Sequence, residues 1–562
     1  MLDMPQSGTR EYLKGRPRGL SIRVLLCLRP VAAAAWASFV LTLAGCVEQG
    51  PLPAEADGQL FARGLQEIAD LYIEPVSNRR LALSGMARLV RLDGELGVSD
   101  SSGADVLALS YCGRNIGLYP LPPDADSGAW GGLVSQSIAT AQQASPRLAA
   151  LSQDTIAQVV FDGMTAALDR FSHYSAPKAA RDLRAARDGF GGIGVTFDAT
   201  SDIFRVTAVT PLGPADRAGI RPEDQIVAID GITTAGRSHE AVADQLRGPV
   251  GSAVALSVVH PGATQPGDFR LQRALVIVPT VTASRDGDIA VFRIASFNRS
   301  TTQRVAEGLA QAQQQTGGRL AGIVLDLRGS PGGLLDQAVS LTDLFIADGP
   351  IVSTIGRHPA SHQYFAASGA GIALRTPLAV LVNGSSASAA EIVAAALQDV
   401  GRAVVVGSSS YGKGTVQTVL RLPNSGELTL TWARLVTPSG YFLQTHGVVP
   451  TLCTVDLRDD ERALDPGLRE VSAVAVAARA TRPRAALDEP AWSELRRLCP
   501  GRRTNPAIDL RLAEHVLADA RLYSEALQAL PATTQLGQGV PAGGRPEPGL
   551  TDLNRALSSG SR

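Results

Sequence analysis

The chain has 562 residues, of which 45% are hydrophobic and 19% are charged, and its formal net charge at pH 7 is -1. This length gives room for several domains, and the composition is that of a globular protein rather than a disordered one. Because the net charge is close to zero and the arginines are spread along the chain, nucleic-acid binding is disfavoured.

The N-terminus resembles a secretory leader. Basic residues precede an apolar run over 31–43, and the run ends in Leu43-Ala44-Gly45-Cys46. These features are typical of a signal peptide over 1–45, and the run is short for a transmembrane helix. The tetrapeptide also resembles a lipoprotein lipobox, which predicts lipidation of Cys46. An ordinary signal peptide with a coincidental cysteine, or a retained anchor, is the alternative.

A helical region is predicted next, followed by a small β-rich domain. Residues 46–58 are rich in proline, glycine and acidic residues, which predicts a tether. The pattern over 59–188 is mostly helical, with an insertion at about 85–155 that contains a Gly, Ser and Pro-rich interruption. From 189 to 273 the period changes to short strands separated by turns, with one strand expected at 204–209.

The second half of the chain alternates buried strands with helices from 274 to 455, which predicts a layered α/β core. Its buried strands are expected at 323–327, 378–382 and 403–406. Helical stretches follow over 456–530, and the Gly, Pro and Ser-rich residues 531–562 are predicted to be disordered. The predicted fold class is therefore a multidomain α+β protein.

The chain contains three lysines among its 52 basic residues. Arginine stays charged at every accessible pH, whereas a buried lysine can lose its proton and act as a base. Lys14 precedes the expected cleavage site, and Lys178 lies in a polar stretch that is typical of a solvated surface. Lys413 lies instead in a glycine-bounded turn, and it is the candidate base.

Ser388 lies between the strand at 378–382 and an alanine-rich helix. Ser388 and Glu391 form a Ser-x-x-Glu capping box, which explains the serine structurally. The same position suits a nucleophile, because the following amides point at the group attacked and the helix dipole favours an oxyanion. A serine needs a base, and no histidine lies in a comparable turn, so Lys413 is the predicted partner.

Two nucleotide-binding patterns occur by coincidence. Gly189 to Gly194 satisfies GxGxxG, but a charged stretch precedes it and a strand follows, which inverts the required context. Residues 407–413 nearly satisfy the P-loop pattern, but Gly414 stands where Ser or Thr should bind the metal. The strand-like alternation over 415–422 lacks the helix N-terminus that holds phosphate. An NTPase is therefore only the second enzyme hypothesis.

The chain has five cysteines. Cys27 would be removed with the leader and Cys46 would carry lipid. In an oxidising compartment the other three permit one disulfide, for which Cys453 and Cys499 are the candidate pair, with Cys112 left over. No CxxC or Cys/His ligand spacing occurs, so neither a metal site nor another cofactor is predicted.

Several sequence stretches resemble those of the carboxyl-terminal processing (tail-specific) proteases. They occur in the same order and with similar spacing, and the resemblance covers about residues 60–525. The matching stretches are 168–174, 190–195, 326–333, 386–391 and 412–417. The chain departs from the family pattern at two single positions. Ala390 replaces the usual second serine, and Thr451 stands where the family often has aspartate. The insertion at about 85–155 is a further departure.

The resemblance implies a catalytic role for five residues. Ser388 would be the nucleophile, Lys413 the general base, and Gln417 the residue that orients Lys413. The backbone N–H groups of Ala389 and of Gly333, or of the glycine before it, would form the oxyanion hole. The same likeness implies a crotonase-like fold for the core.

The resemblance also implies that 189–273 is a PDZ domain inserted before the core. Glycines before a strand free backbone N–H groups to hold the C-terminal carboxylate of a peptide that adds to the sheet. The residues expected there are Gly192, Ile193 and Gly194 in the loop and Val242 and Leu246 on the helix. A β-rich spacer domain is the alternative.

Together these features predict a lipid-anchored serine endopeptidase of the bacterial envelope that faces the periplasm. Its substrates would be unfolded or tailed proteins, cleaved near the C-terminus after the PDZ domain binds the tail. An adaptor lipoprotein is a candidate partner. The main non-enzyme alternative is a PDZ-bearing lipoprotein scaffold with an inactive site.

Overall fold

The computed structural model describes residues 53–101, 105–200, 203–455, 457, 489–502 and 504–528. The predicted leader, the predicted lipidation site Cys46 and the predicted disordered tail lie outside the described residues. None of the described helices is both long enough and apolar enough to cross a membrane.

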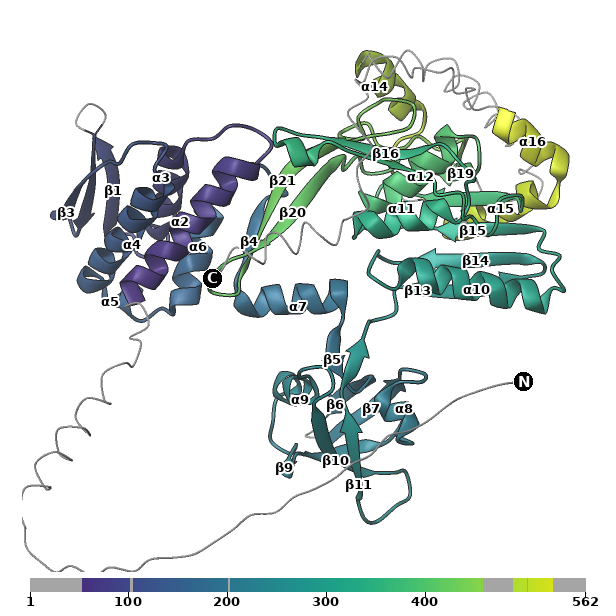
Figure 1. The fold of residues 1–562 in the computed structure, drawn as a ribbon, viewed down its shortest axis with the longest axis horizontal. Coiled ribbons are helices and arrows are strands. Elements are labelled where there is room, and N and C mark those ends of the chain that lie inside the picture. Colours follow the sequence, from purple (N-terminus) through teal and green to yellow (C-terminus); the bar gives the residue numbers. More distant parts are fainter. Residues whose placement is uncertain are drawn as a thin grey trace, which may run out of the picture. The chain divides into compact units, whose positions relative to one another are not determined.

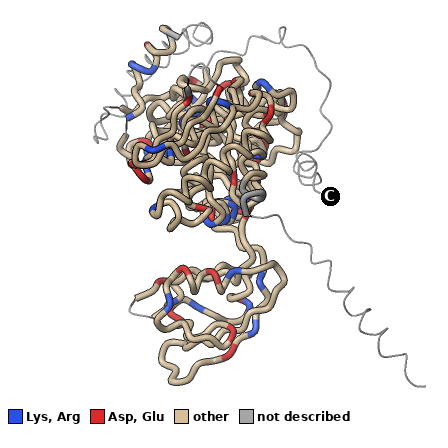
Figure 2. Tube along the Cα trace, turned by 90° about the vertical axis from the view of Figure 1, so that its left-hand side faces the viewer, with Lys and Arg blue, Asp and Glu red and all other residues tan. Residues whose placement is uncertain are grey.

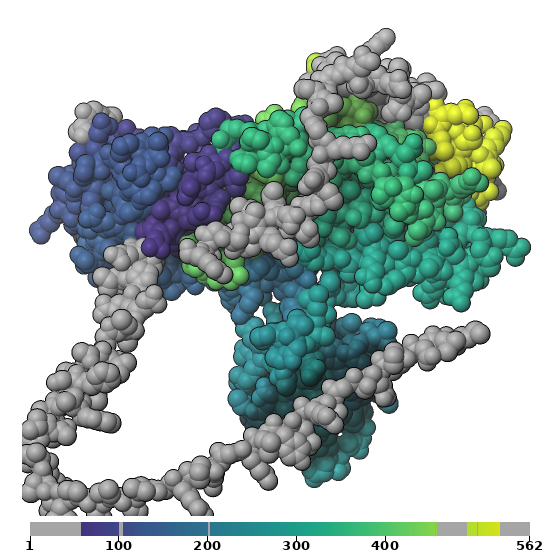
Figure 3. All heavy atoms as spheres, in the orientation of Figure 1, coloured from purple at the N-terminus to yellow at the C-terminus, as the bar shows by residue number. Residues whose placement is uncertain are grey.

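The N-terminal region is a block of helices around one apolar core (Figure 1). Its atoms, purple to blue in the space-filling view, form one continuous mass (Figure 3). Apolar residues at helical spacing in α2, such as Leu65 and Ile68, are fully buried against Phe161 of α6. The helices are α2 (Pro53–Leu71), α3 (Asn78–Leu89), α4 (Ser127–Ala144), α5 (Pro146–Ala149) and α6 (Gln153–Ala166). Because α2 begins at Pro53, the second half of the predicted tether 46–58 is helical instead.

The interruption predicted inside the insertion is an antiparallel sheet of β1, β2 and β3 in that order. Its strands are β1 (Leu96–Ser101), β2 (Val106–Tyr111) and β3 (Arg114–Pro120). Cys112 and Gly113 turn β2 into β3 with positive φ angles of 49° and 72°, a conformation that suits tight hairpins. No strands are predicted here from the sequence, because each segment has only 6 or 7 residues and lies in a stretch rich in glycine, serine and proline.

Residues 189–276 form a small β-rich unit with its own apolar core. Its main sheet has the order β11-β10-β8-β7-β6, with β9 paired to β8, and β5 pairs separately with β12. The strands are β5 (Phe190–Gly192), β6 (Val195–Thr200), β7 (Ile203–Val209), β8 (Gln225–Ile229), β9 (Ile232–Thr233), β10 (Ala253–Val259), β11 (Gly267–Gln272) and β12 (Ala274–Val276). Two helices, α8 (Pro214–Arg217) and α9 (His239–Leu246), complete the unit.

The central sheet of the core has the order β13-β14-β15-β18-β19-β22 and is parallel from β14 onward. The strands are β13 (Val281–Asp286), β14 (Ile289–Ile294), β15 (Gly322–Asp326), β18 (Leu378–Val382), β19 (Val404–Gly407) and β22 (Leu452–Cys453). Three of them, β15, β18 and β19, confirm the strands expected from the sequence.

Helices cover both faces of this sheet (Figure 1). Successive residues of a strand point to opposite faces. Ile323 and Leu325 therefore pack with α10 (Thr301–Gln315), α11 (Leu335–Asp343) and α12 (Ala389–Asp399), whereas Val324 packs with α15. The C-terminal helices also pack on this sheet: α14 (Glu489–Leu498) contributes Trp492 and Leu495 to the core cluster of Ile323 and Leu325, and α15 (Pro506–Ala518) and α16 (Ala520–Gln528) belong to the cluster of Val324. The predicted layered α/β core is confirmed.

A second sheet of the core has the order β17-β16-β21-β20. Its strands are β16 (Pro350–Ile355), β17 (Gln363–Ala366), β20 (Thr415–Arg421) and β21 (Glu427–Val436), with the short helix η1 (Pro359–Ser361) between β16 and β17. β4 (His173–Ser175) pairs with β21 and joins the N-terminal region to the core. The helix α7 (Pro177–Asp188) leads from β4 to the β-rich unit.

The parallel order brings three loops to one edge of the central sheet. Residues 327–334, 383–388 and 408–414 follow β15, β18 and β19, which are neighbours in the sheet. Parallel strands end at the same edge, which is where ligands of α/β proteins bind. Positive and negative residues are interspersed along the described trace, with no basic stripe (Figure 2).

The predicted disulfide is present between Cys453 and Cys499, whose Cα atoms lie 5.9 Å apart. It joins β22 to the end of α14. Cys112 is a free, exposed cysteine, as the sequence analysis expected.

Candidate active site

Ser388 occupies a strained turn at the start of α12. Its φ and ψ angles are 57° and -116°, a conformation that a non-glycine residue adopts only when its surroundings hold it. Ser386 supplies part of that support, because its Oγ donates to the carbonyl of Leu327 at 2.8 Å and accepts from Asn383 N at 2.9 Å. The turn therefore holds the Ser388 hydroxyl at the N-terminus of a completely buried helix.

The backbone of Gly332 lies against Ser388. A Cβ atom added to Gly332 would lie 2.8 Å from Ser388 Cβ and 2.8 Å from Ala389 N. The carbonyl of Gly332 accepts from Phe297 N at 2.9 Å. Because the peptide is trans, the N–H of Gly333 points away from Phe297. Two predicted oxyanion donors, Ala389 and Gly333, thus belong to segments that meet at Ser388.

Glu391 is a buried carboxylate that links the serine turn to the loop carrying Lys413. Its Oε2 accepts from Ser388 N at 2.8 Å and from Lys413 N at 2.9 Å. Its Oε1 accepts from Gly412 N at 2.6 Å and from Ser410 Oγ. Burial raises the pKa of Glu391, and these four hydrogen bonds act against that rise. Glu391 therefore accepts the hydrogen bond from Ser388 N that the predicted capping box requires. The same carboxylate also accepts from backbone N–H groups of the loop that carries Lys413.

Lys413 is partly buried beside the segment that follows α6. Burial lowers its pKa, and the carboxylates of Glu391 and Asp169 oppose this change. Its Nζ lies 5.1 Å from the centre of the Phe171 ring, and the guanidinium of Arg170 lies 4.7 Å from the same ring. The lowered pKa favours a neutral amine, which is the form able to accept a proton.

Two contacts implied by the family resemblance are absent among the described residues. No hydrogen bond joins the Ser388 hydroxyl to Lys413 Nζ, although catalytic hydrogen bonds often tighten only when substrate binds. The amide of Gln417 donates to Thr415 Oγ1 at 2.9 Å and to Thr431 Oγ1 at 3.3 Å rather than to Lys413. A register shift between Val416 and Gln417 accompanies this placement.

A cavity of about 520 Å³ lies next to the lysine. Its walls include Asp169 and Phe171, which neighbour Lys413, and the apolar side chains Ile73 and Phe442. Neither Asp169 nor Phe171 was predicted to have a role, although the stretch 168–174 resembles the family. Their contribution depends on β4 pairing with β21, which brings them to the cavity.

The two departures from the family pattern leave the core intact. Ala390 is fully buried in α12. The hydroxyl of Thr451 accepts from Gln398 Nε2 at 3.0 Å and from Val405 N at 3.3 Å. No group of three or more His, Cys, Asp or Glu side chains among the described residues has an arrangement suited to a metal ion.

The residues predicted to bind a peptide carboxylate lie in the β-rich unit. Gly192 ends β5, and Ile193 and Gly194 connect it to β6, with a positive φ of 80° at Gly194. Val242 and Leu246 lie on α9, and both are buried in one core cluster with Ile193. The structure therefore brings the loop and the helix together, and peptide contact stays a prediction.

Both nucleotide-binding patterns lie in the strand context that was expected from the sequence. Strands β5 and β6 occupy 190–200, so no helix follows the glycines there, and the strand β20 follows Gly414. What the site does contain is a serine on a helix N-terminus, a glycine segment packed against it, and a lysine whose pKa is lowered. These are groups that acyl transfer requires.

The sequence profiles of two known families match the chain. The profile of peptidase family S41 matches residues 288–453, and that of the PDZ domain matches residues 205–259.

Curated relatives and a solved structure are similar over longer stretches. The carboxy-terminal-processing protease of Bartonella bacilliformis is 39% identical over 293 residues, which are 52% of this chain and 68% of the relative. The carboxyl-terminal-processing protease of Synechocystis sp. is 34% identical over 296 residues, 51% of this chain and 68% of the relative. The photosystem II D1 C-terminal processing protease covers 75% of this chain and 97% of its own at 25% identity, with a TM-score of 0.36.

Proposed function

Because the chain belongs to the carboxyl-terminal processing proteases of peptidase family S41, we propose that Ser388 and Lys413 form its catalytic dyad. The family is one of serine peptidases, so the chain is a protease. The observation that carries the proposal is the shared carboxylate oxygen of Glu391, which accepts from the backbone N–H groups of both residues. One buried group thus holds the nucleophile and the base in register.

The proposed reaction is acyl transfer through Ser388. Neutral Lys413 takes the hydroxyl proton as Oγ attacks the scissile carbonyl carbon, and the carbonyl oxygen becomes an oxyanion. The N–H groups of Ala389 and Gly333 bind that oxyanion, and the positive end of α12 adds to its stabilisation. Collapse expels the amine, which takes the proton from Lys413. Water then attacks the acyl-enzyme and gives a proton to Lys413. The second tetrahedral intermediate collapses to the carboxylic product as Ser388 Oγ leaves and takes that proton back from Lys413.

The dyad is tested with variants assayed on an unfolded peptide that has an apolar C-terminal tail. Ser388→Ala and Lys413→Ala should remove nearly all turnover, whereas Ser385→Ala, at an exposed serine of the same turn, should keep it. Lys413→Arg should also be inactive, because arginine keeps its proton and cannot serve as the base. Full activity of Lys413→Arg would rule out Lys413 as the base.

We further propose that the PDZ region reads the free C-terminus of the substrate. Support comes from the PDZ profile match and from the glycine-rich segment next to α9. A disordered tail can add to a sheet edge as a strand, which a folded terminus cannot do. Cleavage of a tailed substrate should slow when its C-terminal carboxylate is amidated. An unchanged rate would show that no carboxylate is read.

The proposed location is the bacterial envelope, with a lipid anchor on Cys46 and the enzyme facing the periplasm. The supports are the lipobox-like sequence before Cys46 and a disulfide, which persists in oxidising compartments. Mass spectrometry of the membrane fraction should find an acylated Cys46 at the mature N-terminus. Cys46→Ser should release the protein or block its maturation. An adaptor lipoprotein stays a candidate partner, to be sought by co-purification with the Ser388→Ala variant.

A further inference from the structure

The loop that carries Lys413 begins with an unusual run of buried serines. Residues 408–414, here called the base loop, connect β19 to β20. Ser408, Ser409 and Ser410 are all fully buried at the start of this loop. A buried hydroxyl is costly unless it is hydrogen-bonded, so each serine needs a partner in the interior.

A separate segment near the C-terminus supplies partners along this run. We call residues 492–502 the anchor segment. Ser408 Oγ donates to the carbonyl of Arg502 at 2.7 Å, and Ser409 Oγ donates to the carbonyl of Cys499 at 2.5 Å. The carbonyl of Ser410 accepts from Arg496 Nη2 at 3.0 Å. Three consecutive residues of the base loop are therefore bound to the anchor segment.

Arg496 also reaches a second loop of the site. Its Nη1 donates to the carbonyl of His446, which also accepts from Trp492 Nε1 at 2.8 Å. His446 lines the cavity next to Lys413. Burial lowers the pKa of Arg496, and the carboxylate of Glu391 opposes this change. A planar guanidinium can hold two carbonyl groups at a fixed separation, which an ammonium group does less well.

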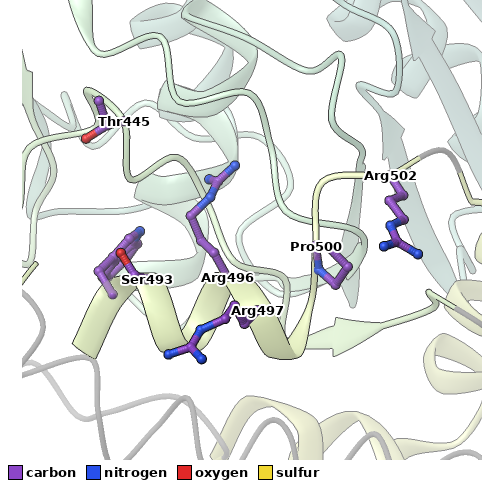
Figure 4. Close-up of a pocket in the computed structure, with 7 residues that line it drawn as sticks. Thr445, Ser493, Arg496, Arg497, Pro500 and Arg502 are labelled. Atoms are coloured by element: carbon purple, nitrogen blue, oxygen red, sulfur yellow. The ribbon is translucent and has the colours of Figure 1, made fainter. Parts of the chain in front are cut away.

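Arg497 provides a natural comparison for Arg496. The side chain of Arg496 extends from α14 toward the protein interior, whereas that of Arg497 extends away from it (Figure 4). Arg497 pairs with Glu494 on the same helix, and both side chains are largely exposed. The two arginines carry the same charge and lie on the same helix. Arg496 contacts the base loop through the carbonyl of Ser410, whereas Arg497 pairs with Glu494.

The disulfide fixes the anchor segment beside the start of the base loop. Cys453 lies in β22 and is opposite Gly407 of β19. Its partner Cys499 belongs to the anchor segment, and its Sγ lies 3.8 Å from the carbonyl of Gly407. Cys499, whose carbonyl accepts the hydrogen bond from Ser409, is thus covalently linked to β22, the neighbour of β19 in the sheet.

We propose that Arg496 is a positioning residue of the protease, which together with the Cys453–Cys499 disulfide holds the base loop and so places Lys413. The inference rests on the proposed role of Lys413 as the base. It goes beyond that role by making catalysis depend on the anchor segment and on the oxidised state of the disulfide. Loss of either restraint should free Lys413 without removing any group that touches substrate.

The first test compares Arg496→Met with Arg497→Met. In a Ser388→Ala background, which prevents self-cleavage, endoproteinase Lys-C should cut after Lys413 much faster in Arg496→Met than in Arg497→Met. Lys178, whose side chain is 63% exposed, serves as the internal reference site. With Ser388 present, kcat of Arg496→Met should fall by about 10- to 100-fold, the scale expected for a misplaced catalytic group, with KM nearly unchanged. Arg496→Lys, with one charged donor, should recover part of this loss.

Equal protection of Lys413 and equal kcat in the two methionine variants would overturn the proposal. If Arg496→Met fails to fold, as judged by its melting transition, Arg496→Gln, which keeps one N–H donor group and adds no lysine for Lys-C to cut, decides the question by the same two readouts. The protection of Lys413 does not depend on turnover. An active Lys413→Arg enzyme would therefore refute the base assignment while leaving the loop measurement valid.

The second test concerns the disulfide. A reductant that opens Cys453–Cys499 should lower kcat of the otherwise unchanged enzyme and expose Lys413 to Lys-C. The double variant Cys453→Ala with Cys499→Ala should show the same lowered kcat with and without reductant. Cys112→Ser, at the exposed free cysteine, should respond to reductant as the parent does. Full kcat of the reduced enzyme, with the disulfide shown to be open by thiol labelling, would refute the role of the disulfide.

Discussion

Ser388 and Lys413 donate their backbone N–H groups to the same carboxylate oxygen, Oε2 of Glu391, at 2.8 and 2.9 Å. The two residues lie on different loops that follow the parallel strands β18 and β19. Their relative position therefore depends on one fully buried side chain as well as on the sheet. This arrangement leads to the first prediction.

Glu391→Gln should weaken the link between the loop of Ser388 and the loop of Lys413, while the side-chain volume stays nearly the same. An amide offers one acceptor oxygen, so its NH₂ group would face N–H or O–H donors that the carboxylate now accepts. Each buried donor left without a partner costs about 1–3 kcal/mol. We expect a lower melting temperature and a fall in kcat on the order of 100-fold from misplacement of the dyad. A variant with normal kcat would show that Glu391 does not hold the two loops in register.

Gly332→Ala should damage the oxyanion site. The added Cβ would lie 2.8 Å from both Ser388 Cβ and Ala389 N, at a φ of 93°. We expect kcat to fall on the order of 100- to 1000-fold, as when one oxyanion donor is lost. Gly329→Ala is the matched control, because Gly329 also has a positive φ, 72°, but its added Cβ meets nothing within 4 Å. Similar kcat losses in both variants would point to backbone strain alone.

The scarcity of lysine allows the ionisation of Lys413 to be measured directly. Burial lowers the pKa of Lys413, whereas the hydrogen bond and ion pair with Glu240 raise that of Lys178. Only a neutral amine reacts with an acylating reagent, so labelling of Lys413 should reach its half-maximum at a lower pH than labelling of Lys178. Peptide mass spectrometry across a pH series measures both in one sample. Half-maxima in the reverse order would contradict the assignment of Lys413 as a base.

Asp169→Asn should move the activity profile along the pH axis. The carboxylate of Asp169 raises the pKa of Lys413 and so opposes the effect of burial. Removing that charge should lower the pKa of Lys413 further. Activity requires the neutral amine, so the rising limb of kcat/KM against pH should shift to lower pH. The asparagine oxygen can still accept from Phe171 N and Ser172 N. A shift to higher pH would show that Asp169 does not act on Lys413 through its charge.

Gly194→Trp should affect tailed substrates more than short peptides. Gly194 has a positive φ of 80°, and its added Cβ would lie 3.1 Å from Thr210 Cβ, so a large side chain would distort the loop expected to bind a carboxylate. The ratio of kcat/KM for a tailed protein to that for a short peptide should therefore fall. Gly219→Trp, at an exposed glycine of the same unit with open space around it, should leave the ratio unchanged. A ratio equal to that of the parent in Gly194→Trp would argue against tail binding at this loop.

Local sequence patterns were sufficient to predict the strands β15, β18 and β19 and to single out Ser388 and Lys413. The strands are continuous apolar runs because helices cover both faces of the sheet. Ser388 and Lys413 are recognisable because each lies in a turn rich in glycine or small residues next to such a strand. The cysteine count allowed one disulfide among Cys112, Cys453 and Cys499, and the structure decided that the candidate pair Cys453 and Cys499 forms it. In each case the signal lies within a few neighbouring residues or in the composition.

The tertiary structure alone decided which distant segments meet at the site. The order of strands placed the loops of Ser388 and Lys413 side by side, and the pairing of β4 with β21 brought Asp169 and Phe171 to the lysine. The tertiary structure also directs the amide of Gln417 to the hydroxyls of Thr415 and Thr431. It brings Arg496 into hydrogen-bond contact with the base loop. Apolar periodicity shows that a strand or helix buries one face, but it does not specify which partner covers that face. Contacts between segments hundreds of residues apart therefore emerge only when the sheets and their covering helices are assembled.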